Sequence, residues 1–168
     1  MNRTILILFV LISNSIYSQN GFADWDKNYK YKSAEKIIQA EIDYAKEVEK
    51  DTTEGHYYVA ISKFRFIAEF TGNKRQIDSE VLNSMKRVFK IKMGSADALN
   101  GLVSKEFEFS IGNSKIWMPI QNQLIDDFKN EIIKGKKVLV YTLFTNEHQF
   151  KGGIINTFLI SEFTTEWE

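Results

Sequence analysis

Polar and apolar side chains alternate along Val103–Ile111, and this alternation constrains the fold more than any other feature of the chain. One side of an extended backbone here carries apolar residues and the other carries small or acidic ones, namely Val103, Phe107, Phe109 and Ile111 against Ser104, Glu106, Glu108 and Ser110. The next pair, Gly112-Asn113, is typical of a tight turn into a second strand over 115–118. Pro119 is expected to end that strand or to mark a sheet edge. The pattern therefore predicts a half-buried hairpin.

Three helices are predicted before this hairpin. The first covers residues 34–50, where Ser33 is a plausible N-cap and apolar residues recur at helical spacing. The third begins at Asp78 or Ser79 and ends at Gly94, with lysines near its C-terminal end, where the helix dipole favours them.

The middle segment, residues 57–70, fits two structures. At helical spacing Tyr57, Ile61 and Phe64 fall on one apolar face, but at strand spacing Phe64, Phe66, Ala68 and Phe70 do so as well. Its length exceeds the usual strand of about 5 to 6 residues and suits a helix. Length therefore favours a helix that ends at Gly72 or Asn73, and the strand remains the alternative.

The C-terminal part completes an α+β pattern. A short amphipathic helix around 124–132 is expected to end at Lys134-Gly135, and apolar strands follow over 138–144 and 153–163, joined by a loop over 146–153. We therefore predict three N-terminal helices packed on a four-stranded, mostly antiparallel sheet, in the order strand, strand, helix, strand, strand. A curved half-barrel is the variant of this arrangement.

Residues 1–18 have the features of a cleavable signal peptide. Arg3 precedes the apolar run Ile5–Ile12, and a polar segment of small residues follows it. The run is shorter than the about 20 residues that a membrane span requires. We expect cleavage after Ser18, with Ser15 as the alternative, and a single domain over 19–168 in the periplasm or outside the cell, without a membrane span once the leader is removed.

Charge and cysteine content exclude several classes of function. The 22 basic and 22 acidic side chains balance, so the chain has no overall field that would attract nucleic acid. The absence of cysteine excludes disulfides, thiol nucleophiles and thiolate metal sites.

Two glutamates are the weak catalytic candidates. Glu106 and Glu108 would lie on one face of a strand, about 6.5 to 7 Å apart, a spacing that a carboxylate-dependent glycosidase could use. The same alternation is typical of a solvated strand face. The two histidines, His56 and His148, are read as surface residues, so neither a metal site nor a cofactor is predicted.

Four aromatic residues are the candidate binding residues. Trp25, Tyr29 and Tyr31 lie outside the periodic elements, and Trp117 points away from its inward neighbours Ile116 and Met118. Core packing, or a strap across the sheet, is the competing interpretation of all four.

The leading hypothesis is a small exported, non-catalytic binding protein, an inhibitor or an immunity-type protein being one form of it. Its partner would be another protein or a glycan. One alternative is a carbohydrate or cell-wall hydrolase that uses Glu106 and Glu108. The other is a carrier of small apolar ligands, which needs an internal cavity of about 300 Å³ or more.

Overall fold

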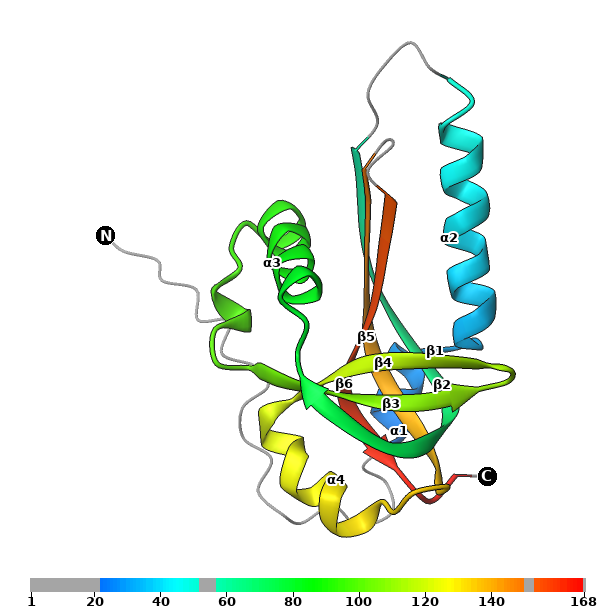
Figure 1. Ribbon diagram of the computed structural model, residues 1–168, viewed down its shortest axis with the longest axis vertical. Helices are drawn as coiled ribbons and strands as arrows, with labels where there is room; N and C mark the ends of the chain where they lie inside the picture. The colour runs from blue at the N-terminus through cyan, green and yellow to red at the C-terminus, as the bar shows by residue number, and fades with distance from the viewer. Residues whose placement is uncertain (1–21, 52–56, 150–152, 168) are drawn as a thin grey trace.

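The computed structural model describes residues 22–51, 57–149 and 153–167 (Figure 1). The leader expected over residues 1–18 and the surface position expected for His56 lie outside the described residues. So does the centre of the loop predicted over 146–153, but residues 146–149 and 153 are strand rather than loop, because they pair with each other and with neighbouring residues across the sheet.

Four α-helices and six strands make up the described fold. The helices are α1 (Ala23–Asn28), α2 (Ala34–Val48), α3 (Ser79–Met93) and α4 (Ile125–Glu131). The strands are β1 (Lys30–Tyr31), β2 (Tyr57–Gln76), β3 (Val103–Ile111), β4 (Ser114–Gln121), β5 (Lys137–Gln149) and β6 (Gly153–Thr164). None of these helices is both long enough and apolar enough to cross a membrane.

The six strands form one mixed sheet whose hydrogen bonding runs in a ring. Their order is β1-β2-β3-β4-β6-β5, and β5 pairs again with β2, so five strands return to their starting point. The ring closes between β4 and β6 through a parallel contact at Ile120 and Ile160, while β1 lies parallel to β2 outside the ring. The predicted α+β class is confirmed, but the sheet has six strands rather than four.

The favoured helix over 57–70 is wrong, because this segment is the first half of β2. Tyr57–Glu69 pairs residue by residue with β5, and Glu69–Gln76 pairs with β3. A strand of 20 residues exceeds the usual length because its two halves serve different neighbours. Length was thus the wrong criterion, and the strand-spaced aromatic pattern was the correct signal. Only two of the three expected N-terminal helices, α2 and α3, therefore exist.

The helices and the hairpin whose ends are set by nearby residues agree more closely with the predictions. Ser33 accepts a hydrogen bond from the Lys36 backbone at the start of α2, Asp78 caps α3, and Gly94 ends α3 with a positive φ. The hairpin over Gly112-Asn113 is confirmed, although β4 continues through Pro119 to Gln121. Pro119 is tolerated there because β4 pairs with β6 only at Ile120, so that β4 is close to an edge strand, as the alternative interpretation of this proline predicted.

Phenylalanine side chains fill the interior of the closed ring of five strands. Phe128 of α4 lies in contact with four of them, at centroid distances of 5.3, 5.0, 5.9 and 5.1 Å to Phe70, Phe107, Phe109 and Phe163. Because α4 covers the lower end of the ring (Figure 1), this one side chain joins the helix to β2, β3 and β6.

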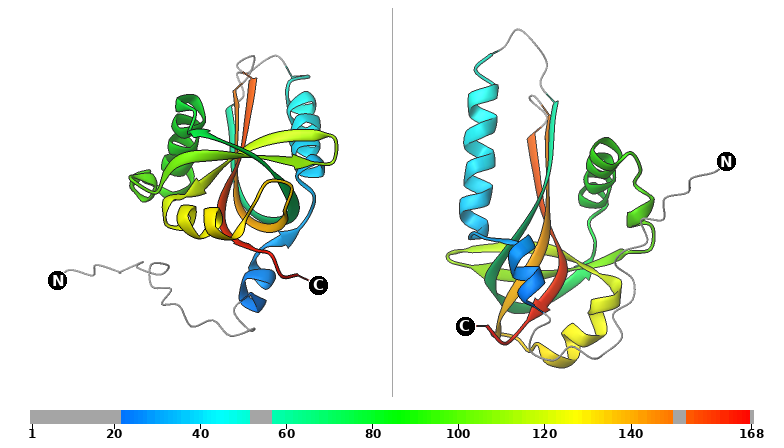
Figure 2. Two further views of the ribbon diagram at one scale, coloured as in Figure 1. Left: turned by 60° about the horizontal axis from the view of Figure 1, so that its bottom comes forward. Right: turned by 180° about the vertical axis from the view of Figure 1, so that it is seen from behind.

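Above the ring, β2, β5 and β6 continue as a three-stranded ribbon between two helices. Figure 2 shows α2 and α3 on opposite sides of it. Adjacent residues of β5 point to opposite sides: Glu147 accepts bonds of 2.6 and 2.7 Å from Arg87 of α3, and His148 lies 2.9 Å from Glu49, just after α2. The prediction that His148 lies on the surface is wrong, because this residue is only 2% exposed.

Phe128→Ala should lower the free energy of unfolding by about 3 to 5 kcal/mol, because it leaves a cavity where four rings now meet. Ile133→Ala is the matched control, since Ile133 is 73% exposed and its loss should cost less than about 0.5 kcal/mol. Urea unfolding of both variants measures the difference. Equal effects would contradict the central position of Phe128.

Glu147 should make the stability depend on pH. Burial by itself raises the pKa of its carboxyl, but hydrogen bonds from Arg87, Ser84 and Tyr57 outweigh burial and lower the pKa to about 2. Since the pKa is lower in the folded than in the unfolded chain, the stabilisation is present above the unfolded value of 4.5 and is lost as the pH falls toward 2.

The expected contribution at neutral pH is on the order of 2 to 3 kcal/mol. Urea unfolding of the wild type and of Glu147→Gln, at a series of pH values, should show a difference in the free energy of unfolding that becomes smaller as the pH falls. A difference that stays constant would contradict this role of the carboxylate.

Candidate functional site

The candidate site is the outer face of β2, β3 and β4. Because Phe107 and Phe109 point into the ring, the residues that alternate with them on β3 point outward. We call this surface the Trp117 face and define it by seven residues: Thr71, Asn73, Arg75, Glu106, Glu108, Lys115 and Trp117. It unites three of the sequence-predicted site residues, Glu106, Glu108 and Trp117.

Arg75 links Glu106 to Trp117. Its Nε lies 2.6 Å from Oε2 of Glu106, and its guanidinium lies 4.2 Å from the centroid of the Trp117 ring. Glu106 is 1% exposed, so the arginine both covers the carboxylate and neutralises it. The half-buried Trp117 and the planar guanidinium therefore form a fixed pair on the surface.

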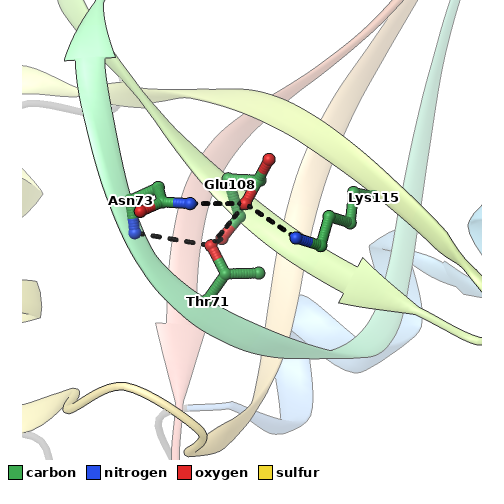
Figure 3. A network of polar contacts seen from close by, with 4 residues as sticks. All are labelled: Thr71, Asn73, Glu108 and Lys115. Carbon is green, nitrogen blue, oxygen red and sulfur yellow. Dashed lines mark hydrogen bonds and ion pairs between the residues drawn. The ribbon is translucent and has the colours of Figure 1, made fainter.

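Glu108 is held by three other side chains (Figure 3). Its Oε2 accepts hydrogen bonds of 2.8 Å from Oγ1 of Thr71 and 2.8 Å from Nδ2 of Asn73, and Nζ of Lys115 lies 3.8 Å away. The bonds from Thr71 and Asn73, with the nearby charge of Lys115, lower the pKa of this carboxyl. Glu108 is thereby kept ionised.

An irregularity in β2 makes this arrangement possible. The register with β3 shifts between Phe70 and Lys74, so that residues 71–73 lie opposite Glu108 alone. Gly72, at the centre of the shift, has a φ of 92° and the side chain of Lys134 packs close to it. The positive φ requires glycine and allows both Thr71 and Asn73 to reach one carboxylate.

This geometry suits binding better than acid–base chemistry. A glycosidase needs one carboxyl whose pKa is raised so that it can act as an acid, whereas the pKa of Glu108 is lowered and Glu106 is occupied by Arg75. The prediction that both lie on one strand face is confirmed. The solvated character expected for that face is wrong, since they are only 1% and 9% exposed.

A hollow of about 280 Å³, lined in part by Thr71, Asn73 and Lys115, borders the Trp117 face, and a second one of about 330 Å³ adjoins the first. Both include Glu69 and Ser110, which form a cross-strand pair, so the hollows lie on either side of that pair. Lys115 and Lys134 line the first, and Lys137 lines the second. The border of the face is therefore polar and largely basic.

The other predicted binding residues lie elsewhere. Tyr29 is buried against Tyr141, and Trp25 packs on both, at centroid distances of 5.2 and 5.7 Å. Tyr29 and Trp25 thus belong to a core cluster with Tyr141. Tyr31 remains 60% exposed, with the guanidinium of Arg65 5.9 Å from its ring.

No known protein family matches this chain, and neither the curated proteins nor the solved structures contain a match to it. Within the part of the chain that the structure describes, no group of three or more histidine or acidic side chains could hold a metal ion. The site is thus characterised by its own geometry.

Sequence reasoning missed Thr71, Asn73, Arg75 and Lys115. The predicted helix places Thr71 and Asn73 at its C-terminal end, and nothing local to Arg75 indicates that it lies opposite Glu106. A usable signal existed, however, because the strand-spaced residues Phe66, Ala68 and Phe70 lead directly into this segment.

Arg75→Ala should destabilise the fold by about 2 to 4 kcal/mol, because it leaves the Glu106 carboxylate buried without its cation. In a Glu106→Gln background the same change should cost less, since the amide carries no charge. A double-mutant cycle by urea unfolding should give a coupling of at least about 1 kcal/mol. Additive effects would show that the pair is not coupled.

Proposed function

We propose that this chain is a small exported, non-catalytic binding protein that uses the Trp117 face to bind an acidic region of a partner protein. The proposal keeps the inhibitor-type or immunity-type role as its most specific form. Export rests on the leader pattern of residues 1–18.

The Arg75–Trp117 pair is the single observation that carries the proposal. Tryptophan and arginine are the residue types that most often dominate the energy of protein interfaces. Here both lie on strands, and Arg75 is already held by Glu106 and by the ring of Trp117. Because little side-chain freedom remains to be lost on binding, such a pair is well suited to anchor a partner.

Charge favours an acidic partner. Arg75 and Lys115 neutralise the two glutamates of the face, whereas Lys134 and Lys137 line the neighbouring hollows without an ion pair to any described carboxylate. Glu69 is the acidic residue that lines both hollows. An incoming carboxylate would therefore meet a local excess of positive charge, although the chain as a whole is neutral.

The two alternatives receive less support. The hydrolase needs a raised carboxyl pKa, and the carboxyl of Glu108 has a lowered one. The apolar carrier needs an internal apolar cavity, whereas aromatic side chains fill the interior of the ring and both hollows are lined in part by Glu69, Ser110 and lysines.

Affinity capture with the purified chain, followed by binding measurements on the captured protein, tests the proposal. Trp117→Ala should weaken binding by about tenfold or more. Lys134→Glu/Lys137→Glu should weaken it as well and reduce its dependence on salt.

Lys46→Glu/Lys50→Glu is the matched control, because it makes the same charge change at exposed positions on α2 and just after it, and should leave binding intact. A partner that is indifferent to both changes on the Trp117 face would contradict the proposal. A glycan that depends on Trp117 but not on the lysines would replace the protein partner.

A further inference from the structure

The β6 strand has an open edge along the ribbon. From Gly153 to Leu159 it pairs with β5 on one side in an unbroken register, from Leu143↔Leu159 to Gln149↔Gly153. On its other side β6 meets β4 only at Ile160. In the part of the chain that the structure describes, no strand pairs with the remaining edge, over 153–159.

Helices cover both faces of the ribbon but do not pair with this edge. On one face Met85 and Phe89 of α3 pack in a cluster with Leu159. On the other face the ring of Tyr44 on α2 lies 4.9 Å from that of Tyr58. Among the described residues, the backbone edge of β6 over 153–159 is thus left without a strand partner.

The features that usually protect an edge strand are absent from this one. Residues 153–161 contain no charged side chain and no proline, and the register with β5 shows no bulge between 153 and 160. The opposite edge of the ribbon differs in part, because β1 covers β2 at Phe64 and Arg65 and Lys63 adds a charge, although no described strand pairs with that edge over 57–62. The longer uncharged run, over 153–161, therefore lies on β6.

We propose that the β6 edge pairs with the β6 edge of a second copy of this chain, antiparallel across a two-fold axis. This inference is independent of the binding proposed for the Trp117 face. A self-pair of this uncharged segment brings no like charges together, which is the condition that identical strands must satisfy.

Centred on Asn156, the pair places Ile155 opposite Thr157 and Ile154 opposite Phe158. These are β-branched and aromatic combinations of the kind that stabilise antiparallel strands. Oδ1 of Asn156 accepts a hydrogen bond of 2.8 Å from Nδ2 of Asn146. At the axis each Asn156 can still donate from its own Nδ2 to the Oδ1 of the other copy, because an amide oxygen has two lone pairs. The two ribbons would then form one continuous sheet.

Sedimentation equilibrium of the purified chain, from low micromolar to near-millimolar concentration, tests the proposal. The wild type should dimerise, and Asn156→Lys, which places two ammonium groups opposite each other, should raise the dissociation constant by about tenfold or more. Ser62→Lys adds the same charge to the other edge strand of the ribbon and should leave the dimer intact.

Hydrogen exchange of the wild type gives a readout that does not depend on any variant. Amides of residues 153–159 that point away from β5 should become protected as the concentration rises. A chain that stays monomeric throughout overturns the proposal. So does a dimer whose edge amides exchange at a constant rate, because it must use another surface, or protection that appears only with another protein bound.

Discussion

The fold depends on the exchange of strand partners along β2. This strand leaves β5 and joins β3 near Glu69 and Phe70, and only by curving through that point can five strands close into a ring. The curvature has a local cause in the shifted register at residues 71–73 and the positive φ of Gly72. Ring closure in turn creates an interior wide enough for Phe128 and the rings around it.

The same irregularity shapes the outer surface. In a regular ladder one residue of β2 would oppose Glu108, whereas the shifted register offers it both Thr71 and Asn73. Alternation along β3 then accounts for the rest, since each inward phenylalanine has an outward glutamate as its neighbour. The Trp117 face is therefore a direct consequence of how the ring closes.

The sequence predicted those features that short segments encode. The β3–β4 hairpin, both long helices and the shared face of Glu106 and Glu108 follow from alternation, caps and turn residues within a few positions. The sequence could not predict β2, because residues 57–70 are apolar at both the helical and the strand spacing. Pairing with β3 and β5 decides between the two structures. Because β2 was not predicted, Arg75 could not be placed beside Glu106. The sequence therefore predicted the acidic and aromatic residues of the site but not the residues that hold them.

Register along the ribbon is fixed by charge as well as by shape. Glu147 faces Arg87 on α3, while the next residue, His148, faces Glu49 after α2. A slip of β5 by one residue would exchange the two sides and bring Glu147 toward Glu49 and His148 toward Arg87. Apolar side chains on both faces would tolerate that slip far better, because most of them could exchange places without losing burial. The buried polar pairs thus exclude the wrong register, and a single pairing of β5 with its neighbours follows.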